Sequence, residues 1–306
     1  MAHMPIYDMF FITGMSGAGK TLALKILNDK GYHEIDNLPL HFIDNLIAED
    51  QKNLIAKRAL GFGGKINAED VKSFCYIIEK LRSRSDIRLC LVYLDAIDDV
   101  LINRYALTGL SHPFGGENTL ENHLRMERAM HVPLLECAGL KLDTSLLHPR
   151  QLMSIIGDIV SHEVSAKPHI LISSFGFKFG TPRGSEIIFD ARLLKNPHWD
   201  INLRDLTGQH PDVAAYIEED EKTAPFLAQI TAYLKFAIID MPQAGKNFYS
   251  IGIGCTGGKH RSVYLAEKIK DFFAMHQYDC HIFHKSLSYD DTESISDNDD
   301  LLRKQL

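Results

Sequence analysis

The chain has 306 residues, of which 45% are hydrophobic and 24% charged, and this composition supports a large core and argues against a mainly disordered protein. Its 33 lysine and arginine residues against 40 aspartate and glutamate residues give a net charge of −7, which argues against a wholly basic nucleic-acid-binding protein. We expect two domains for this length.

In the first half, short apolar runs alternate with longer amphipathic segments, a pattern typical of a parallel sheet with crossover helices. Residues 8–13 predict a strand, and a glycine-rich turn from Gly14 leads into a helix that ends near Gly31. Asn67 is a typical N-cap for the next helix. Beyond it, the sequence predicts strands over 87–94 and 140–142 and helices over 120–138 and 148–165.

The pattern starts again after Ala166-Lys167-Pro168 with a strand over 169–173. We therefore expect a first domain over residues 5–165 and a second over 168–285. The second contains predicted strands at 186–190, 248–254 and 280–284 and predicted helices at 224–239 and 262–276. The predicted fold class is α/β, with a parallel sheet in the first domain followed by a second α/β domain.

The remaining residues, 286–306, hold six acidic side chains against Arg303 and Lys304 and predict a mobile, acidic tail. No apolar run approaches the roughly 20 residues that a membrane-spanning helix needs, and the N-terminus does not look like a signal peptide. The five cysteines include no C-x-x-C pair. These features predict a cytoplasmic protein with reduced thiols.

A phosphate-binding loop follows the first predicted strand. It fits the pattern G-x-x-x-x-G-K-[ST] and reads Gly14-Met15-Ser16-Gly17-Ala18-Gly19-Lys20-Thr21. Its glycines allow a tight turn whose backbone N–H groups point inward, and the following helix adds the positive end of its dipole. We expect Lys20 to contact the β- and γ-phosphates of a nucleotide and Thr21 to bind Mg²⁺.

Other charged residues complete this candidate nucleotide site. Asp95, at the end of an apolar strand, is the candidate carboxylate for Mg²⁺, with helix capping as the alternative. Arg104 lies in the following helix, and Arg125 and Arg128 are spaced to share one face of another. Each arginine fits a phosphate contact and a solvated helix face equally well.

A second loop of similar design lies in the second domain, over residues 251–263. Thr256 supplies a hydroxyl, and Lys259, His260 and Arg261 supply donors that are cationic or can become so. The pattern predicts an anion site. The alternative is a glycine turn whose cations face water.

Cys255 gives this loop another interpretation. With Arg261 and Ser262 it fits the C-x5-R-S pattern of cysteine-dependent phosphatases, in which a helix N-terminus lowers the thiol pKa and the arginine holds the phosphoryl oxygens. Lys259 and His260 stand where such enzymes more often have small residues, and no general-acid aspartate is evident. A packed, unreactive thiol is therefore the favoured interpretation.

Several motifs together resemble the nucleotide-binding RapZ family, bacterial P-loop proteins that include an RNase adaptor. In the first domain these are the phosphate-binding loop and Asp36-Asn37-Leu38-Pro39. In the second they are Ser174-Phe175-Gly176-Phe177-Lys178, Phe189-Asp190-Ala191-Arg192, Asn196-Pro197-His198-Trp199 and Gly254-Cys255-Thr256-Gly257-Gly258-Lys259-His260-Arg261-Ser262.

The resemblance implies a kinase-like P-loop NTPase domain that binds ATP or GTP with Mg²⁺ and hydrolyses it slowly. It also implies a second domain similar to the phosphofructokinase fold, which senses glucosamine-6-phosphate. Implied partners are a small regulatory RNA and an endoribonuclease, which act in the control of amino-sugar synthesis, and further copies of the chain in a homo-oligomer. The implied sugar-phosphate contacts are Arg192, His198, Thr256, Gly257, His260 and Arg261, and the implied RNA contact is Lys178.

The chain also departs from the family pattern. Gly61-Phe62-Gly63-Gly64-Lys65 replaces a stretch that contains an acid and arginines, and the acidic tail replaces a basic one. Because phosphate contacts dominate RNA affinity, an acidic tail weighs against RNA binding. The alternative functions are a small-molecule kinase with Asp36 or Asp95 near the acceptor hydroxyl, the phosphatase, and an RNA-binding module.

Overall fold

The structure is a computed structural model that describes residues 7–116, 118–161, 167–241, 246 and 248–287. It divides into two compact units, which we call unit 1 (Met1–Glu163) and unit 2 (Val164–Leu306) and describe separately. The predicted acidic tail lies outside the described residues from residue 288 onward.

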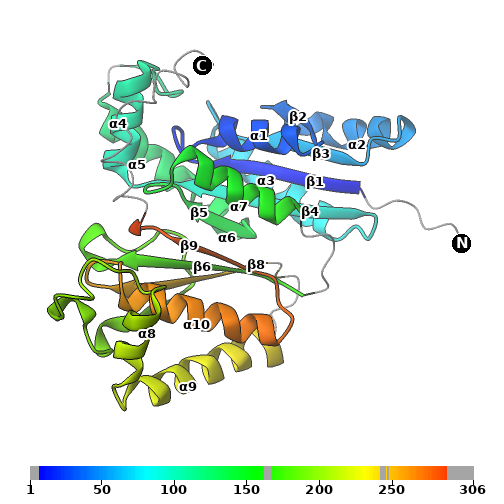
Figure 1. Ribbon diagram of the computed structural model, residues 1–306. Coiled ribbons are helices and arrows are strands. Elements are labelled where there is room, and N and C mark those ends of the chain that lie inside the picture. The colour runs from blue at the N-terminus through cyan, green and yellow to red at the C-terminus, as the bar shows by residue number, and fades with distance from the viewer. Residues whose placement is uncertain (1–6, 117, 162–166, 242–245, 247, 288–306) are drawn as a thin grey trace, which may run out of the picture. The chain divides into compact units, whose positions relative to one another are not determined.

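Unit 1 contains a five-stranded parallel sheet in the order β2-β3-β1-β4-β5 (Figure 1). The neighbouring strands β1 and β4 are buried along almost their whole length, as expected for strands covered on both faces. This parallel arrangement confirms the predicted fold class. The strands are β1 (Tyr7–Gly14), β2 (His33–Asp36), β3 (Lys57–Gly61), β4 (Ile87–Asp95) and β5 (Leu140–Asp143).

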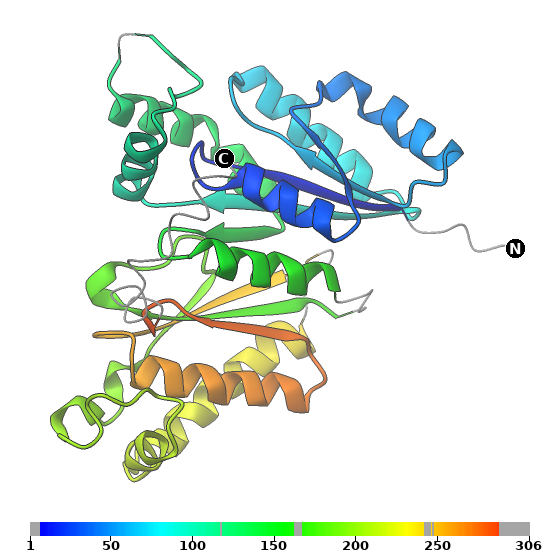
Figure 2. The same cartoon turned by 45° about the horizontal axis from the view of Figure 1, so that its top comes forward.

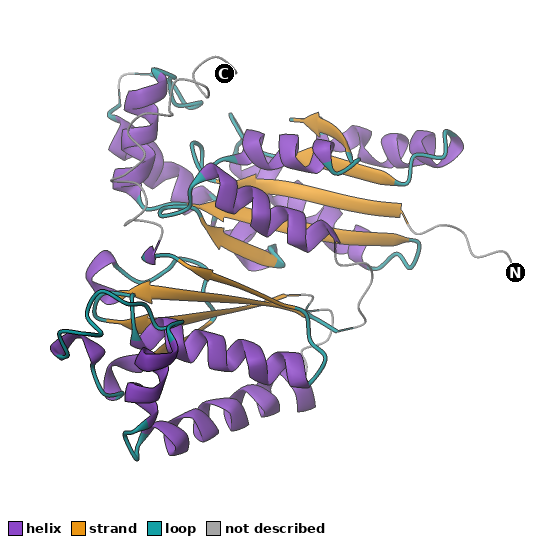
Figure 3. Ribbon diagram, in the orientation of Figure 1, coloured by secondary structure: helices purple, strands orange, loops and turns teal. Residues whose placement is uncertain are grey.

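Helices cover both faces of this sheet (Figure 3). Successive residues of a strand point to opposite faces. Phe11 therefore packs against Phe74, with ring centroids 5.4 Å apart, whereas Phe10 packs against Tyr32 at 5.1 Å. The helices are α1 (Lys20–Asp29), α2 (Ile43–Lys52), α3 (Ala68–Arg82), α4 (Asp98–Thr108), α5 (Leu120–Met130), α6 (Val132–Cys137) and α7 (Pro149–Ser161).

Local sequence explains two helix boundaries. Asn67 caps α3 as predicted, because its side chain accepts hydrogen bonds from two N–H groups of the first turn and Asp70 accepts one from the Asn67 N–H in return. The helix predicted over 120–138 is instead two helices, α5 and α6, which meet at His131. Pro133 explains this break, because proline has no N–H with which to continue the hydrogen bonding of α5.

Unit 2 contains a four-stranded parallel sheet in the order β7-β8-β6-β9 (Figure 2). The helix predicted over 224–239 is α9, which continues from Lys235 to Asp240 as a π-helical segment. Similarity to the phosphofructokinase fold stays a prediction. The elements are β6 (His169–Gly176), β7 (Ile187–Asp190), β8 (Phe248–Cys255), β9 (Cys280–His284), α8 (Pro211–Glu218), α9 (Thr223–Leu234) and α10 (Arg261–Met275).

In each unit, a glycine-rich loop leaves the carboxyl end of an inner strand. Residues 15–19 connect β1 to α1, and residues 256–260 connect β8 to α10. Because the strands are parallel, the other strands of each unit end at the same edge, where their last residues can complete a site. All five cysteines are free thiols, and no helix in the described ranges is both long and apolar enough to cross a membrane.

Candidate functional site

The first loop turns tightly around the end of its strand. Gly14 pairs with Leu94 of β4 and has a φ of 130°, and a Cβ on Gly14 would lie 2.0 Å from the Leu94 carbonyl oxygen. Only glycine fits this position. The loop then enters α1, whose first turn contains Lys20 and Thr21 as predicted.

Lys20 bends back over this loop. Its Nζ donates to the carbonyl oxygens of Gly14 (2.8 Å) and Met15 (3.1 Å). Burial lowers the pKa of the Lys20 ammonium group, while the negative charges of Glu127 and Asp36 oppose that shift. The Lys20 side chain therefore lies at the phosphate-binding turn, where the charges of two acidic side chains favour its protonated form.

A buried carboxylate that the sequence analysis missed contacts the same loop. Glu127 of α5 is 1% exposed and accepts hydrogen bonds from the backbone N–H (3.0 Å) and the hydroxyl (2.7 Å) of Ser16. Its other oxygen lies 3.1 Å from His112 Nε2. Burial raises the pKa of Glu127, but the contacts with His112 and Ser16 and the charge of Lys20 outweigh it and hold the pKa below its usual range. A negative charge thus occupies donors of the phosphate-binding loop.

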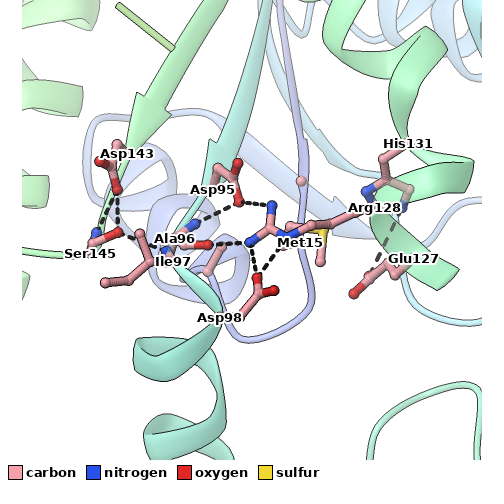
Figure 4. Close-up of polar contacts among 12 residues, drawn as sticks. Met15, Asp95, Ala96, Ile97, Asp98, Glu127, Arg128, His131, Asp143 and Ser145 are labelled. Atoms are coloured by element: carbon pink, nitrogen blue, oxygen red, sulfur yellow. Dashed lines mark hydrogen bonds and ion pairs between the residues drawn. The ribbon is translucent and has the colours of Figure 1, made fainter. Parts of the chain in front are cut away.

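His131 also approaches Glu127, with 3.9 Å between His131 Nε2 and Glu127 Oε1 (Figure 4). The His131 Nδ1 lies 3.2 Å from the hydroxyl of Tyr93. Burial lowers the pKa of His131 to about 4, so the imidazole is neutral at physiological pH. The loop is therefore backed by a buried cluster in which Glu127 is a carboxylate and His131 is a neutral imidazole.

Asp95 ends β4, next to the strand that carries the loop, and is held by Arg128 of α5 (Figure 4). The Arg128 guanidinium donates to Asp95 Oδ1 (2.8 Å), to Asp98 Oδ1 (2.7 Å) and to the carbonyl oxygen of Ala96. Arg125 is exposed, in agreement with the solvated helix face that was its alternative. The two arginines therefore do not act together.

A cavity of about 280 Å³ adjoins the first loop and is lined by Arg104. Arg104 donates to the carbonyl oxygen of Gly17 (3.1 Å) and to the hydroxyl (3.0 Å) and carbonyl oxygen (2.6 Å) of Thr144. The apolar part of the lining includes Leu147 and Leu152. A cation and an apolar wall beside a phosphate loop fit the sugar and base of a nucleotide.

Thr21 and Asp95 offer the oxygen ligands that Mg²⁺ prefers. Thr21 is exposed in the first turn of α1, and Asp95 ends the neighbouring strand. Within the described residues there is no group of three or more His, Cys, Asp or Glu side chains that could hold a metal. These two residues would hold an ion that takes its remaining ligands from phosphate and water, as Mg²⁺ does in nucleotide sites, although Asp95 Oδ1 already accepts from Arg128 and from the Ala96 N–H.

The second loop brings Arg261 into the interior of unit 2. Arg261 is 7% exposed, and its guanidinium donates to the carbonyl oxygens of Arg192 (3.0 Å) and Leu194 (3.3 Å) and to the hydroxyl of Thr256 (3.3 Å). Its Nε is buried and has no partner among the described residues. A buried donor without an acceptor is unusual and is available to a bound anion.

A cavity of about 620 Å³ opens over this loop. Arg192 does not line it, because its guanidinium pairs with Asp190 (2.7 Å) and lies 4.4 Å over the ring of Phe177. Arg192 instead contributes the carbonyl oxygen that holds Arg261. The cavity does bring together the other implied sugar-phosphate contacts and the implied RNA contact, namely His198, Thr256, Gly257, His260, Arg261 and Lys178.

The lining of this cavity is rich in cationic side chains. Asp205 is the one carboxylate among the described lining residues, and the sequence analysis missed it because it lies in a loop far from the motif. Burial lowers the pKa of His260, so this imidazole is neutral at physiological pH. The cations that accompany it are Lys178, Arg204, Lys259 and Arg261. Cations fit a phosphate group, and a carboxylate fits an ammonium group.

Cys255 lies beneath the same loop and is 3% exposed. Its sulfur accepts the N–H of Gly258 at 3.2 Å and lies 3.1 Å from the hydroxyl of Ser262. These contacts hold the thiol within the loop, and its lack of reactivity stays a prediction.

Two family models match the chain, the RapZ-like N-terminal domain over residues 7–163 and the RapZ C-terminal domain over residues 168–288. Among curated relatives, a nucleotide-binding protein of Rhodospirillum rubrum is 37% identical over 90% of this chain and 86% of its own length. A nucleotide-binding protein of Zymomonas mobilis is 34% identical over 95% of this chain and 92% of its own length.

Solved structures that align with part of the chain include two kinases. A shikimate kinase from Bacteroides thetaiotaomicron is 16% identical, covers 50% of this chain and 96% of its own, and has a TM-score of 0.31. A gluconokinase from Sinorhizobium meliloti is 16% identical, covers 52% of this chain and 99% of its own, and has a TM-score of 0.33.

Proposed function

This chain belongs to the RapZ family, and from that premise we propose that it is a cytoplasmic regulatory protein with two ligands. Unit 1 binds ATP or GTP with Mg²⁺ and hydrolyses the nucleotide slowly, and unit 2 binds glucosamine-6-phosphate. Each unit has a strand–loop–helix turn with a cation, Lys20 or Arg261, at the edge where its parallel strands end. This shared geometry carries the proposal.

In unit 1, the phosphates lie at the turn that contains Lys20, and the sugar and base enter the cavity beside Arg104. Thr21 and Asp95 would hold a magnesium ion, which would neutralise phosphate charge. Glu127 opposes the binding of anions at Ser16, so a nucleotide must compete with it for those donors. Nucleotide binding at these donors therefore acts directly on a side chain of α5, the helix that also carries Arg128.

In unit 2, the phosphate of the sugar meets Arg261 and the other cations of the cavity. The amino group of the sugar meets Asp205, the carboxylate of that lining. A ligand that carries both a phosphate and an ammonium group matches both features at once. The combination favours an amino-sugar phosphate over a neutral sugar phosphate.

The partners are a small regulatory RNA, an endoribonuclease and further copies of the chain. The occupancy of the two ligand sites sets the affinity of the chain for these partners. Basic and aromatic side chains at the unit 2 cavity support the RNA contact. Lys178 lies 4.5 Å over the ring of Phe179, and Trp199 is 78% exposed. Exposed aromatic rings beside cations are typical of surfaces that stack unpaired bases.

Calorimetry with Lys20→Ala tests the nucleotide site. We expect its affinity for ATP with Mg²⁺ to fall roughly 10- to 100-fold, as for the loss of a charge-assisted contact, while glucosamine-6-phosphate binds as before. Lys25→Ala is the matched control, because Lys25 is an exposed lysine of the same helix. Unchanged nucleotide affinity in Lys20→Ala would refute the site.

A further inference from the structure

We infer that unit 1 has a second ligand site beside Lys20, a pocket that binds a small hydroxylated carboxylic acid as the acceptor of the nucleotide's γ-phosphate. The role of this pocket rests on the proposed nucleotide binding by unit 1. It makes unit 1 a small-molecule kinase, with slow hydrolysis as the reaction in the absence of the acceptor.

The pocket is a cavity of about 640 Å³ formed within unit 1. Three segments line it: residues 37–41 after β2, residues 62–66 after β3, and α3 through Asp70, Ser73 and Ile77. All five strands of this sheet are parallel, so β2 and β3 end at the same edge as β1 and its phosphate-binding loop. The cavity is therefore at the edge of the sheet where the γ-phosphate is expected.

Two glycines at the end of β3 and just after it lie against Lys20 and Asp36, two side chains that adjoin the cavity lining without belonging to it. A Cβ on Gly63, which lines the cavity, would lie 2.7 Å from Lys20 Cε and 3.3 Å from Lys20 Nζ. A Cβ on Gly61 would lie 2.1 Å from Asp36 Oδ1. A side chain at either position would displace Lys20 or Asp36. The stretch Gly61–Lys65, which departs from the family pattern, thus leaves room for Lys20 and Asp36 beside one short segment of backbone.

Asp36 is placed to take up a proton. It ends β2 and is exposed, and its negative charge opposes the lowering of the Lys20 pKa. The next residue, Asn37, has a left-handed backbone with a φ of 54° and donates its N–H to the carbonyl oxygen of Gly61 (3.1 Å). Few residues other than glycine adopt this conformation. Here it turns the chain from Asp36 directly into the cavity lining.

The lining favours a hydroxylated anion as the ligand. Lys65 is an exposed cation that can pair with the carboxylate group of a ligand, while Asp70, the carboxylate of the lining, already accepts the N–H of Asn67. The polar side chains of Asn37, His41 and Ser73 can hydrogen-bond to hydroxyl groups. The apolar residues Leu38, Phe62, Ile66 and Ile77 cover the carbon skeleton. The volume is in the range of small-molecule sites.

The reaction is a phosphoryl transfer. A hydroxyl oxygen of the acid attacks the γ-phosphorus and forms a new P–O bond, while the bond between that phosphorus and the β–γ bridging oxygen breaks. The electron pair of the broken bond leaves with the nucleoside diphosphate. The hydroxyl proton passes to the Asp36 carboxylate and then to water. Lys20 stabilises the charge on the transferring group.

The test measures where the labelled phosphate goes. The full chain is incubated with γ-³²P-labelled ATP and Mg²⁺ in the presence of D-glycerate, D-gluconate or D-quinate. We expect transfer to at least one of these acids to exceed hydrolysis at least tenfold. Ser73→Trp, which fills the cavity from α3, should lower this transfer at least tenfold. Lys72→Trp, an exposed neighbour on the same helix that does not line the cavity, should leave it unchanged.

A second variant guards against misfolding of the first. Lys65→Ala should raise the KM for the acid about tenfold with little change in kcat, because Lys65 binds the carboxylate and not the reacting hydroxyl. The pocket assignment is overturned if labelled phosphate appears only in water while calorimetry shows that nucleotide binds. If nucleotide does not bind at all, the proposed function of unit 1 fails as well, so the two failures are distinguishable.

Discussion

The two anion loops share one local design but differ in what surrounds their donors. In unit 1, Ser16 donates to the buried carboxylate of Glu127, and Lys20 is attracted by the same charge. In unit 2, Arg261 donates to neutral carbonyl oxygens below a cavity whose charged lining residues are mainly cations. An anion must displace a carboxylate at the first loop but meets mainly positive charge at the second. The shape of a loop therefore does not set its anion affinity, because neighbouring elements supply the opposing or supporting charge.

The largest effect is expected for Arg261→Ala. Loss of the guanidinium removes the central cation of the second loop and should weaken glucosamine-6-phosphate binding by at least about 100-fold. Calorimetry with ATP on the same variant is the control, and nucleotide affinity should stay the same. Arg261→Lys should retain part of the affinity, because lysine restores the positive charge but not the paired hydrogen-bond donors of the guanidinium. Unchanged sugar-phosphate affinity in Arg261→Ala would contradict the assignment of an anion site to the second loop.

The cluster behind the first loop should make the stability of unit 1 depend on pH. The pKa of His131 is about 4 in the folded protein and 6.5 in the unfolded chain. As the pH falls, the unfolded chain therefore takes up a proton at a higher pH than the folded protein does. The stabilisation is complete above pH 6.5 and is lost as the pH falls towards 4, by on the order of 3 kcal/mol. Urea unfolding at pH 7.5 and pH 4.5 measures this loss, and His131→Gln should reduce it. An equal loss in the variant would contradict the assignment to His131.

Glu127→Gln removes the opposing charge at the first loop. Nucleotide affinity should rise, by roughly tenfold, because the phosphate no longer competes with a carboxylate for Ser16. The pKa of Glu127 is lowered, so the group is charged at neutral pH and the gain should be the same at pH 6 and pH 8. Calorimetry at both pH values measures it. A weaker nucleotide affinity would show that Glu127 assists binding instead of opposing it.

The smallest effect is expected for Asp205→Asn in unit 2. The variant loses the carboxylate that pairs with an ammonium group, so the preference for glucosamine-6-phosphate over glucose-6-phosphate should fall about fivefold. Competition binding with the two sugars measures the ratio. Glucose-6-phosphate itself should bind nearly as before. A preference that persists in Asp205→Asn would place recognition of the amine elsewhere.

Sequence patterns predicted both loops because each depends on contiguous residues. Lys20 and Arg261 lie at the starts of helices that follow strands, and glycine spacing alone indicates such turns. The N-cap at Asn67 was predicted for the same reason, because its partners are two and three residues away. Local chemistry is readable from one sequence.

Residues that act across long sequence separations were missed or left open. Glu127 is 111 residues from Ser16, and nothing in its helix distinguishes it from a solvated charge. Arg128 and Arg125 looked equivalent, but Asp95 at the end of β4 and Asp98 at the start of α4 meet only the position that Arg128 occupies on α5. These contacts depend on how a distant helix packs against the sheet, which periodicity does not encode.

A sulfate soak of crystals of the full chain tests most directly whether each unit holds an anion at its loop. We predict sulfate density at two places, one within hydrogen-bonding distance of Lys20 and one within hydrogen-bonding distance of Arg261. Density at neither loop, or at only one of them at high sulfate concentration, would contradict the presence of a separate anion site in each half of the chain.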